Sequence, residues 1–150
     1  MENIFDQAVN NRIVERINTL TLETQPSWGK MDVAQMLAHC SVAYDGIYDD
    51  ARSPVAGFKK FLLKLFVKKI VVSDKSYKKN SRTAPEFLIV DKRDFKTEKE
   101  RLVKYLNKTQ ELGAEHFDGK ASHSFGPLTR NEWNNMFYKH LDHHLKQFGA

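Results

Sequence analysis

The sequence contains little cysteine and no long hydrophobic run. Its single cysteine, Cys40, cannot form an internal disulfide, which fits a reducing compartment, and we expect it to be a small core residue. The longest uninterrupted aliphatic or aromatic run spans only residues 87–90, whereas a transmembrane helix needs about 20 apolar residues. The first residues have neither the basic start nor the apolar segment of a signal peptide. We therefore expect no membrane span and a cytoplasmic location.

Length and composition predict one domain. A chain of 150 residues with 41% hydrophobic content can bury roughly two-thirds of its unfolded surface around a single core, so we expect residues 1–150 to form one unit. The net charge of +5 is unevenly distributed. Residues 57–82 carry nine lysines or arginines and one acidic residue, a net +8, and the rest of the chain is therefore −3. Such a local basic segment can attract phosphate, an anionic lipid surface or an acidic substrate.

Apolar residues recur at helical spacing in five segments. These span residues 6–20, 32–50, 57–72, 91–112 (with 94 as the alternative start) and 129–148. Two starts are capping boxes, Asp32 with Gln35 and Thr129 with Glu132. Residues 73–91 indicate an irregular or extended crossover. The sequence predicts an all-α fold, a four-helix bundle with one long crossover connection and an additional basic amphipathic helix formed by the third segment.

The third segment has distinct apolar and basic faces. The apolar residues that share one broad face are Phe58, Phe61, Leu62, Leu65 and Phe66. A stripe of Lys60, Lys64 and Lys68 lies opposite them. The more economical prediction places the apolar face in the core and the lysines in water, with no specific nucleic-acid partner. The alternative is a non-catalytic module that uses this helix to bind nucleic acid or an anionic membrane.

Three of the six histidines lie in the last predicted helix. At about 100° per residue, His140 and His144 lie some 40° apart and share a face with Trp133 and Phe137, so they point inward. Two imidazoles at i and i+4 can reach one cation, as they do in zinc peptidases. Leu141 occupies the position where those peptidases have their glutamate, which argues against that activity.

A catalytic metal site needs three protein ligands and an open position, so a third ligand must come from upstream. His39 is the best candidate, because it lies at the edge of the apolar stripe of the second predicted helix and would face a groove between helices. His123 is the next candidate and His116 the third. Alternatively, the inward histidines are hydrogen-bonded core residues without an ion, although burying two unpaired imidazoles is costly.

Other polar residues are candidates for contact with a substrate. His143 lies about 60° from His140 on the last helix, which favours a solvated or supporting position. Gln35, one turn before the candidate ligand of the second helix, and Asp50 align with the same groove. We predict substrate contacts from Gln35, Asp50, His123 and His143, and no convincing general acid or base accompanies the ligands.

Five blocks of the sequence carry a family resemblance. They are WGKM at 28–31, QMLAHC at 35–40, NSRTAPEF at 80–87, FGPLTR at 125–130 and YKHLDHH at 138–144. Together they resemble a bacterial family of unknown function within the DinB/YfiT-like superfamily. The resemblance implies a four-helix bundle whose metal is held by one histidine of the second helix and a His-x-x-x-His pair of the last. In this sequence the motif falls on His39, His140 and His144.

The resemblance also implies a type of chemistry. Members of that superfamily include thiol-dependent transferases and isomerases that use low-molecular-weight thiols such as bacillithiol or mycothiol. It therefore implies a divalent ion, Zn²⁺ or Ni²⁺, that binds a thiol co-substrate as thiolate for attack on a small-molecule electrophile. A hydrolase with activated water is equally open, and a purely structural ion is a third alternative. Relatives often form homodimers, although no helix here has a second apolar stripe that would predict one.

Overall fold

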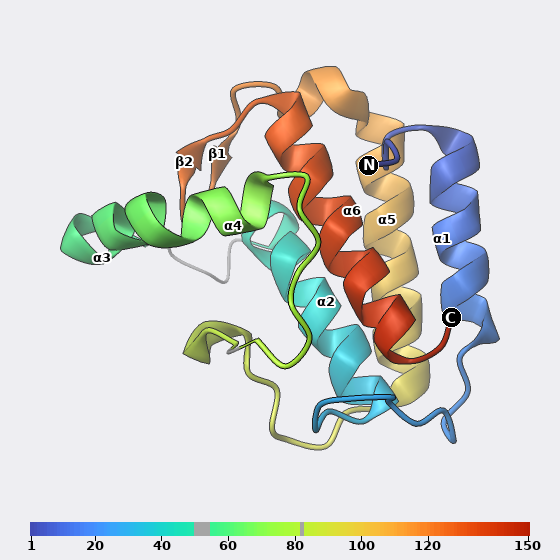
Figure 1. Ribbon diagram of the computed structural model, residues 1–150. Coiled ribbons are helices and arrows are strands. Elements are labelled where there is room, and N and C mark those ends of the chain that lie inside the picture. Colours follow the sequence, from blue (N-terminus) through green and yellow to red (C-terminus); the bar gives the residue numbers. More distant parts are fainter. Residues whose placement is uncertain (50–54, 82) are drawn as a thin grey trace.

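The computed structural model describes residues 1–49, 55–81 and 83–150, and it is mostly helical, which confirms the prediction of an all-α fold. The long helices are α1 (Gln7–Thr19), α2 (Val33–Tyr48), α5 (Phe95–Phe117) and α6 (Arg130–Gln147). They lie side by side, with α5 and α6 each in contact with the other three (Figure 1). None of the described helices is both long and apolar enough to cross a membrane.

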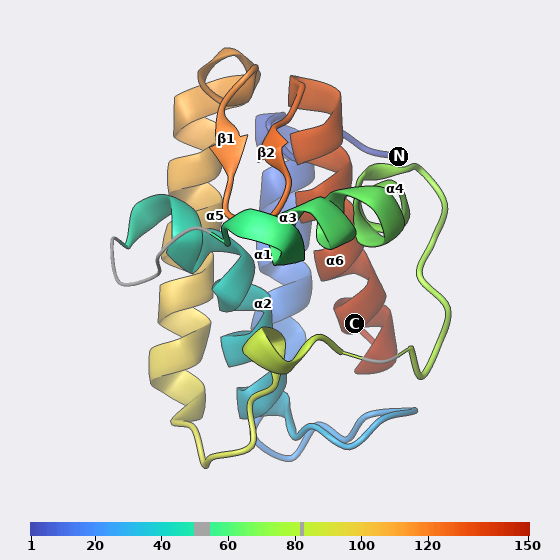
Figure 2. The same ribbon diagram turned by 90° about the vertical axis from the view of Figure 1, so that its left-hand side faces the viewer.

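Shorter elements fill the connections. After α2, the chain forms α3 (Gly57–Leu62), the π-helical η1 (Leu63–Val67) and α4 (Lys68–Val72) in direct succession. Figure 2 shows that these three elements run across the long helices and not along them. In its described residues, the crossover to α5 is irregular apart from the 3₁₀ turn η2 (Pro85–Phe87), as predicted. The loop before α6 contains a small antiparallel pair, β1 (Ala121–Ser122) with β2 (Gly126–Pro127).

Helix boundaries follow from the caps that the sequence provides. Both predicted capping boxes are present, at the starts of α2 and α6. Asp94 caps α5 by accepting a hydrogen bond from the backbone N–H of Thr97 at 2.8 Å, which selects the later of the two predicted starts. Gly113, with φ of 72°, interrupts the helix where the prediction ended it, and helical structure then resumes to Phe117.

The core lies between the four long helices and is rich in aromatic side chains. Tyr44 of α2 stacks on Phe137 of α6 with ring centroids 4.8 Å apart, and Trp133 packs against Phe137 at 5.2 Å. Cys40 is buried, its Sγ lies 3.7 Å from Sδ of Met36, and burial raises the pKa of its thiol. The prediction of a core role for this cysteine is therefore confirmed.

The prediction for the apolar face of 57–72 is wrong. Its five apolar residues are exposed, from 38% for Leu62 to 74% for Phe58. Leu63, Val67 and Val71, spaced four residues apart, form a second apolar stripe on the opposite side of the segment. The structure packs this stripe against the core instead. Lys68, expected in water, forms an ion pair with Glu132 of α6 at 2.8 Å.

Candidate metal centre

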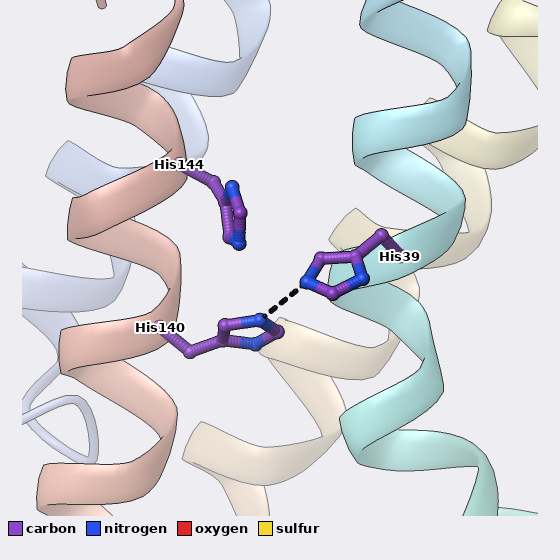
Figure 3. A group of neighbouring side chains, drawn as sticks. All are labelled: His39, His140 and His144. Carbon is purple, nitrogen blue, oxygen red and sulfur yellow. Dashed lines mark hydrogen bonds between the residues drawn. The ribbon is translucent and has the colours of Figure 1, made fainter. Parts of the chain in front are cut away.

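The structure brings together the three histidines that the sequence predicts as ligands. His39 projects from α2 toward His140 and His144, which project from successive turns of α6 (Figure 3). One ring nitrogen from each lies within 4.8 Å of the others. The ring centroids are 4.6 to 4.9 Å apart. We call these three residues the histidine cluster.

Hydrogen bonds fix the tautomers of two of these rings. Nδ1 of His39 lies 2.8 Å from the carbonyl oxygen of Phe87, which can only accept, so Nδ1–H is the donor. Nε2 of the neutral ring is then an acceptor, and it receives a hydrogen bond from Nε2–H of His140 at 2.9 Å. In His144, Nδ1–H donates to Oε1 of Gln147 at 2.8 Å, which leaves the Nε2 lone pair available. Nε2 is therefore the unprotonated nitrogen in both His39 and His144, the nitrogen that a metal ion would bind, and an ion at His39 would replace its hydrogen bond from His140.

Burial keeps the cluster neutral. Desolvation lowers the pKa of His39, and it lowers the pKa of His144 to about 3. Burial, followed by the neighbouring imidazoles, lowers the pKa of His140 well below its usual value. In the part of the chain that the structure describes, no carboxylate joins the cluster. Three neutral imidazoles are a donor set that fits Zn²⁺ or Ni²⁺, because the ligands need not lose protons and the ion keeps its full charge.

Gln147 orients His144, and sequence reasoning missed it. Its side chain is 3% exposed, its Oε1 accepts from His144, and its Nε2–H donates to the carbonyl oxygen of Trp28 at 2.5 Å. Gly29 allows this approach, because a Cβ there would lie 2.5 Å from Nε2 of Gln147, and its φ of +86° also favours glycine. The 28–31 block therefore supports the cluster through Gln147. The sequence feature that could have indicated this role of Gln147 is its position three residues after His144, which places both side chains on the same side of a helix.

The block at 80–87 supports the cluster through its backbone. The 3₁₀ turn η2 ends at Phe87, whose carbonyl oxygen accepts from His39 and whose ring lies 6.0 Å from the imidazole, edge to face. A main-chain acceptor has no side-chain signature, so sequence reasoning could not have identified it. The crossover between α4 and α5 thus supplies one wall of the site.

His143, for which the sequence predicts a solvated or supporting position, lies beside the cluster. Its ring is 5.1 Å from that of His144 and contacts the rings of Trp28 and Tyr77 edge to face. These residues line a cleft of about 130 Å³. Its walls are aromatic and basic: Trp28, Tyr77, Lys79, Lys139, His143 and Lys146. Asp142 also lines it, paired with Lys146 at 2.7 Å.

The two other ligand candidates do not join the cluster. His123 packs against α2 at Gly46, so closely that a Cβ on this glycine would lie 3.2 Å from Cβ of His123. Gly46 is seven residues, or roughly 10 Å along the helix, beyond the ligand of α2. His116 shares a hydrogen bond with Lys120 at 2.9 Å. Among the described residues, His123 and His116 therefore lie outside the group that could hold an ion.

The remaining predicted contacts stay predictions. Gln35 is occupied in capping, because its Oε1 accepts from the backbone N–H of Asp32 and its Nε2–H donates to the carbonyl oxygen of Asp91. The hydrogen bond to Asp91 nevertheless connects α2 to the crossover that lies beside the histidine cluster. Asp50 lies outside the described residues.

Comparison with known proteins identifies a family but no activity. The chain matches the model of one protein family, described as a protein of unknown function (DUF1569), over residues 5–150. No curated protein and no solved structure matches it.

Proposed function

Because the chain belongs to the DUF1569 family of proteins of unknown function, and this membership names no reaction, we propose its function from the site: a metal-dependent enzyme that acts on a small molecule. His39, His140 and His144 would hold the divalent ion. The observation that carries this proposal is the convergence of three neutral imidazoles, two of them oriented by hydrogen bonds on their far side. Without an ion, the hydrogen bond from His140 uses only one of the two Nε2 lone pairs, that of His39.

We also place the arrangement of α1, α2, α5 and α6 in the four-helix bundle of the DinB/YfiT-like superfamily. Support comes from the origin of the three histidines, one from α2 and an i, i+4 pair from α6. That is the distribution which the resemblance implies. The long crossover after α4, which reaches α5 past the cluster, is further support.

The chemistry favoured by this proposal is thiol transfer. A divalent ion, when bound, supplies Lewis acidity that lowers the pKa of a thiol or a water. No carboxylate of the described residues joins the cluster as a base. A free thiol has a pKa near 8.5 and bulk water one of about 15.7, so the thiol needs less help to deprotonate. Activation of water for hydrolysis remains the alternative function.

The cleft beside His143 supports an anionic group on the substrate. Lys79 lies over the Trp28 ring at 4.3 Å, and Lys139 over the Tyr77 ring at 4.7 Å, so cations and aromatic faces alternate along the wall. His143 lines this cleft and lies beside the cluster, with its ring 5.1 Å from that of His144. A small molecule that reaches the cluster with its reactive group would place a carboxylate or phosphate against the exposed Lys79.

Metal content tests the first step of the proposal. Protein purified without chelator should contain about one transition-metal ion per chain by elemental analysis, and the His140→Ala variant should contain little. The matched control is His116→Ala, which removes a histidine outside the cluster and should retain the ion. Absence of an ion from wild-type protein even after metal loading would refute the proposal.

Spectroscopy of the Co²⁺ form tests whether a thiol reaches the ion. Adding a small thiol should produce sulfur-to-cobalt charge-transfer absorption, and the alcohol with the same carbon skeleton should not. A bound ion whose spectrum is unchanged by thiol would exclude the thiol-dependent reaction. If the bound ion also exchanges no water and its spectrum does not change when small anions are added, it has no open coordination position and its role is structural.

A further inference from the structure

The outer face of residues 57–72 is an exposed apolar surface. Six of its side chains are large, apolar and exposed: Phe58 (74%), Phe61 (58%), Leu62 (38%), Leu65 (59%), Phe66 (65%) and Ile70 (61%). We call these six residues the outer apolar face. Single exposed apolar residues are ordinary on a protein surface, but six on consecutive turns of one helical segment form a contiguous patch that marks an interaction site.

The segment is held in this orientation by α6. The ammonium of Lys139 donates to the carbonyl oxygens of Ile70 and Ser73 at 2.8 and 2.5 Å, and Nδ2–H of Asn135 donates to that of Val72 at 2.9 Å. These bonds satisfy carbonyls that the end of α4 leaves unpaired. Leu63 and Val67 pack inward, so the six outer residues cannot reach the core without breaking both sets of contacts.

Exposed lysines accompany the outer apolar face. Lys64 and Lys69 lie on the same helical segment, and Lys75, Lys78 and Lys79 follow it. The segment 57–82 carries a net charge of +8. An amphipathic segment that combines aromatic and aliphatic residues with lysines can bury its apolar side chains below lipid headgroups while the lysines contact their phosphates.

We infer that residues 57–72 dock this protein on the surface of an anionic phospholipid bilayer. A second copy of the chain is a poorer occupant, because two-fold pairing of this face would bring two +8 segments together. Duplex nucleic acid would contact the lysines but leave the phenylalanines in water. An anionic lipid surface satisfies both features at once. The inference does not depend on the proposed metal chemistry.

Vesicle flotation with the full chain tests this inference. Wild-type protein should float with vesicles of equal parts phosphatidylcholine and phosphatidylglycerol, and the bound fraction should fall with salt. The Lys64→Gln, Lys69→Gln double variant should lose about thirtyfold in partition coefficient, at roughly fivefold per lysine. Phe61→Ser with Phe66→Ser should lose at least about tenfold. All four side chains are exposed, so both variants should fold as the wild type does, which circular dichroism melting checks.

Matched controls make the result specific. Leu88→Ser with Val90→Ser removes two exposed apolar residues outside the segment, and Lys96→Gln with Lys104→Gln removes two exposed lysines of α5. Both should float like wild-type protein. No binding to the anionic vesicles, or equal losses in the controls, would overturn the inference. So would a dimer in light scattering that the phenylalanine variant abolishes, or lysine-dependent binding of duplex DNA without lipid binding.

Discussion

At the scale of single residues, the link from Trp28 through Gln147 to His144 determines how the cluster presents its lone pairs. Gln147→Ala removes the acceptor of the His144 Nδ1–H bond and leaves the Trp28 carbonyl oxygen without its donor. We expect metal affinity to fall about 10- to 100-fold, the usual cost of losing an outer hydrogen bond to a ligand histidine. Competition with a chromophoric chelator measures this affinity. Asn131→Ala, which removes an exposed amide from the same helix, should bind metal normally, and equal affinities in all three proteins would contradict the assigned role.

The pH dependence of stability also follows from the residues of the cluster. Their pKa values are lowered in the folded protein, so below pH 6.5 the unfolded chain takes up protons that the folded chain does not. Stability should therefore be lost as pH falls below 6.5, by at most about 1.4 kcal/mol per pH unit for each histidine until its lowered pKa is reached, and should not depend on these groups above 6.5. Urea unfolding of metal-free protein measures the slope. It should be shallower in His140→Asn than in the wild type, and an unchanged slope would show that this ring is not buried neutral.

The sequence could predict the three residues of the histidine cluster but only part of their support. His140 and His144 are predictable because helical spacing alone places them on one inward face, and His39 because it borders an apolar stripe. That α2 and α6 face one another across the cluster depends on the packing of the whole fold, which spacing does not encode. The Phe87 carbonyl and the Gln147 amide act through distances that only the folded chain sets.

At the scale of elements, one cation holds the end of α4 to α6. Lys139 is 4% exposed, and burial lowers its pKa to about 8, yet it donates to two carbonyl oxygens at the end of that helix. Lys139→Met keeps the length of the side chain and removes those bonds, at a cost of about 1.5–3 kcal/mol. Amide exchange measured by mass spectrometry should become about 10- to 100-fold faster in residues 57–73. Lys104→Met, at an exposed site of α5, should change nothing there, and unaltered exchange in the Lys139 variant would mean that Leu63 and Val67 suffice to hold the segment.

The same segment shows why an element can be predicted while its orientation is not. The apolar spacing of 57–72 correctly indicates a helix, and the capping residues of α2, α5 and α6 fix their starts. The prediction of which face is buried assumed an ideal α-helix with about 3.6 residues per turn. That repeat already places Leu63 and Val67 on the face opposite Phe61 and Leu65, and it is this second apolar face that packs against the core. A segment with apolar residues on nearly every side has no sequence pattern strong enough to settle which ones are buried.

At the scale of the whole molecule, an ion in the cluster would join two long helices and stabilise the fold. Binding only to the folded state raises the free energy of unfolding by about 2.7 kcal/mol when free ion is at 100 times its dissociation constant. For a chain of 150 residues this corresponds to a rise of about 5–11 °C in Tm. Calorimetry with Zn²⁺ and then with excess chelator should show the rise and its reversal in wild-type protein and in His123→Ala. His39→Ala should show neither, because two imidazoles of α6 alone do not bridge helices. An equal rise in the His39 variant would place the ion elsewhere and leave the cluster as a packed, hydrogen-bonded part of the core.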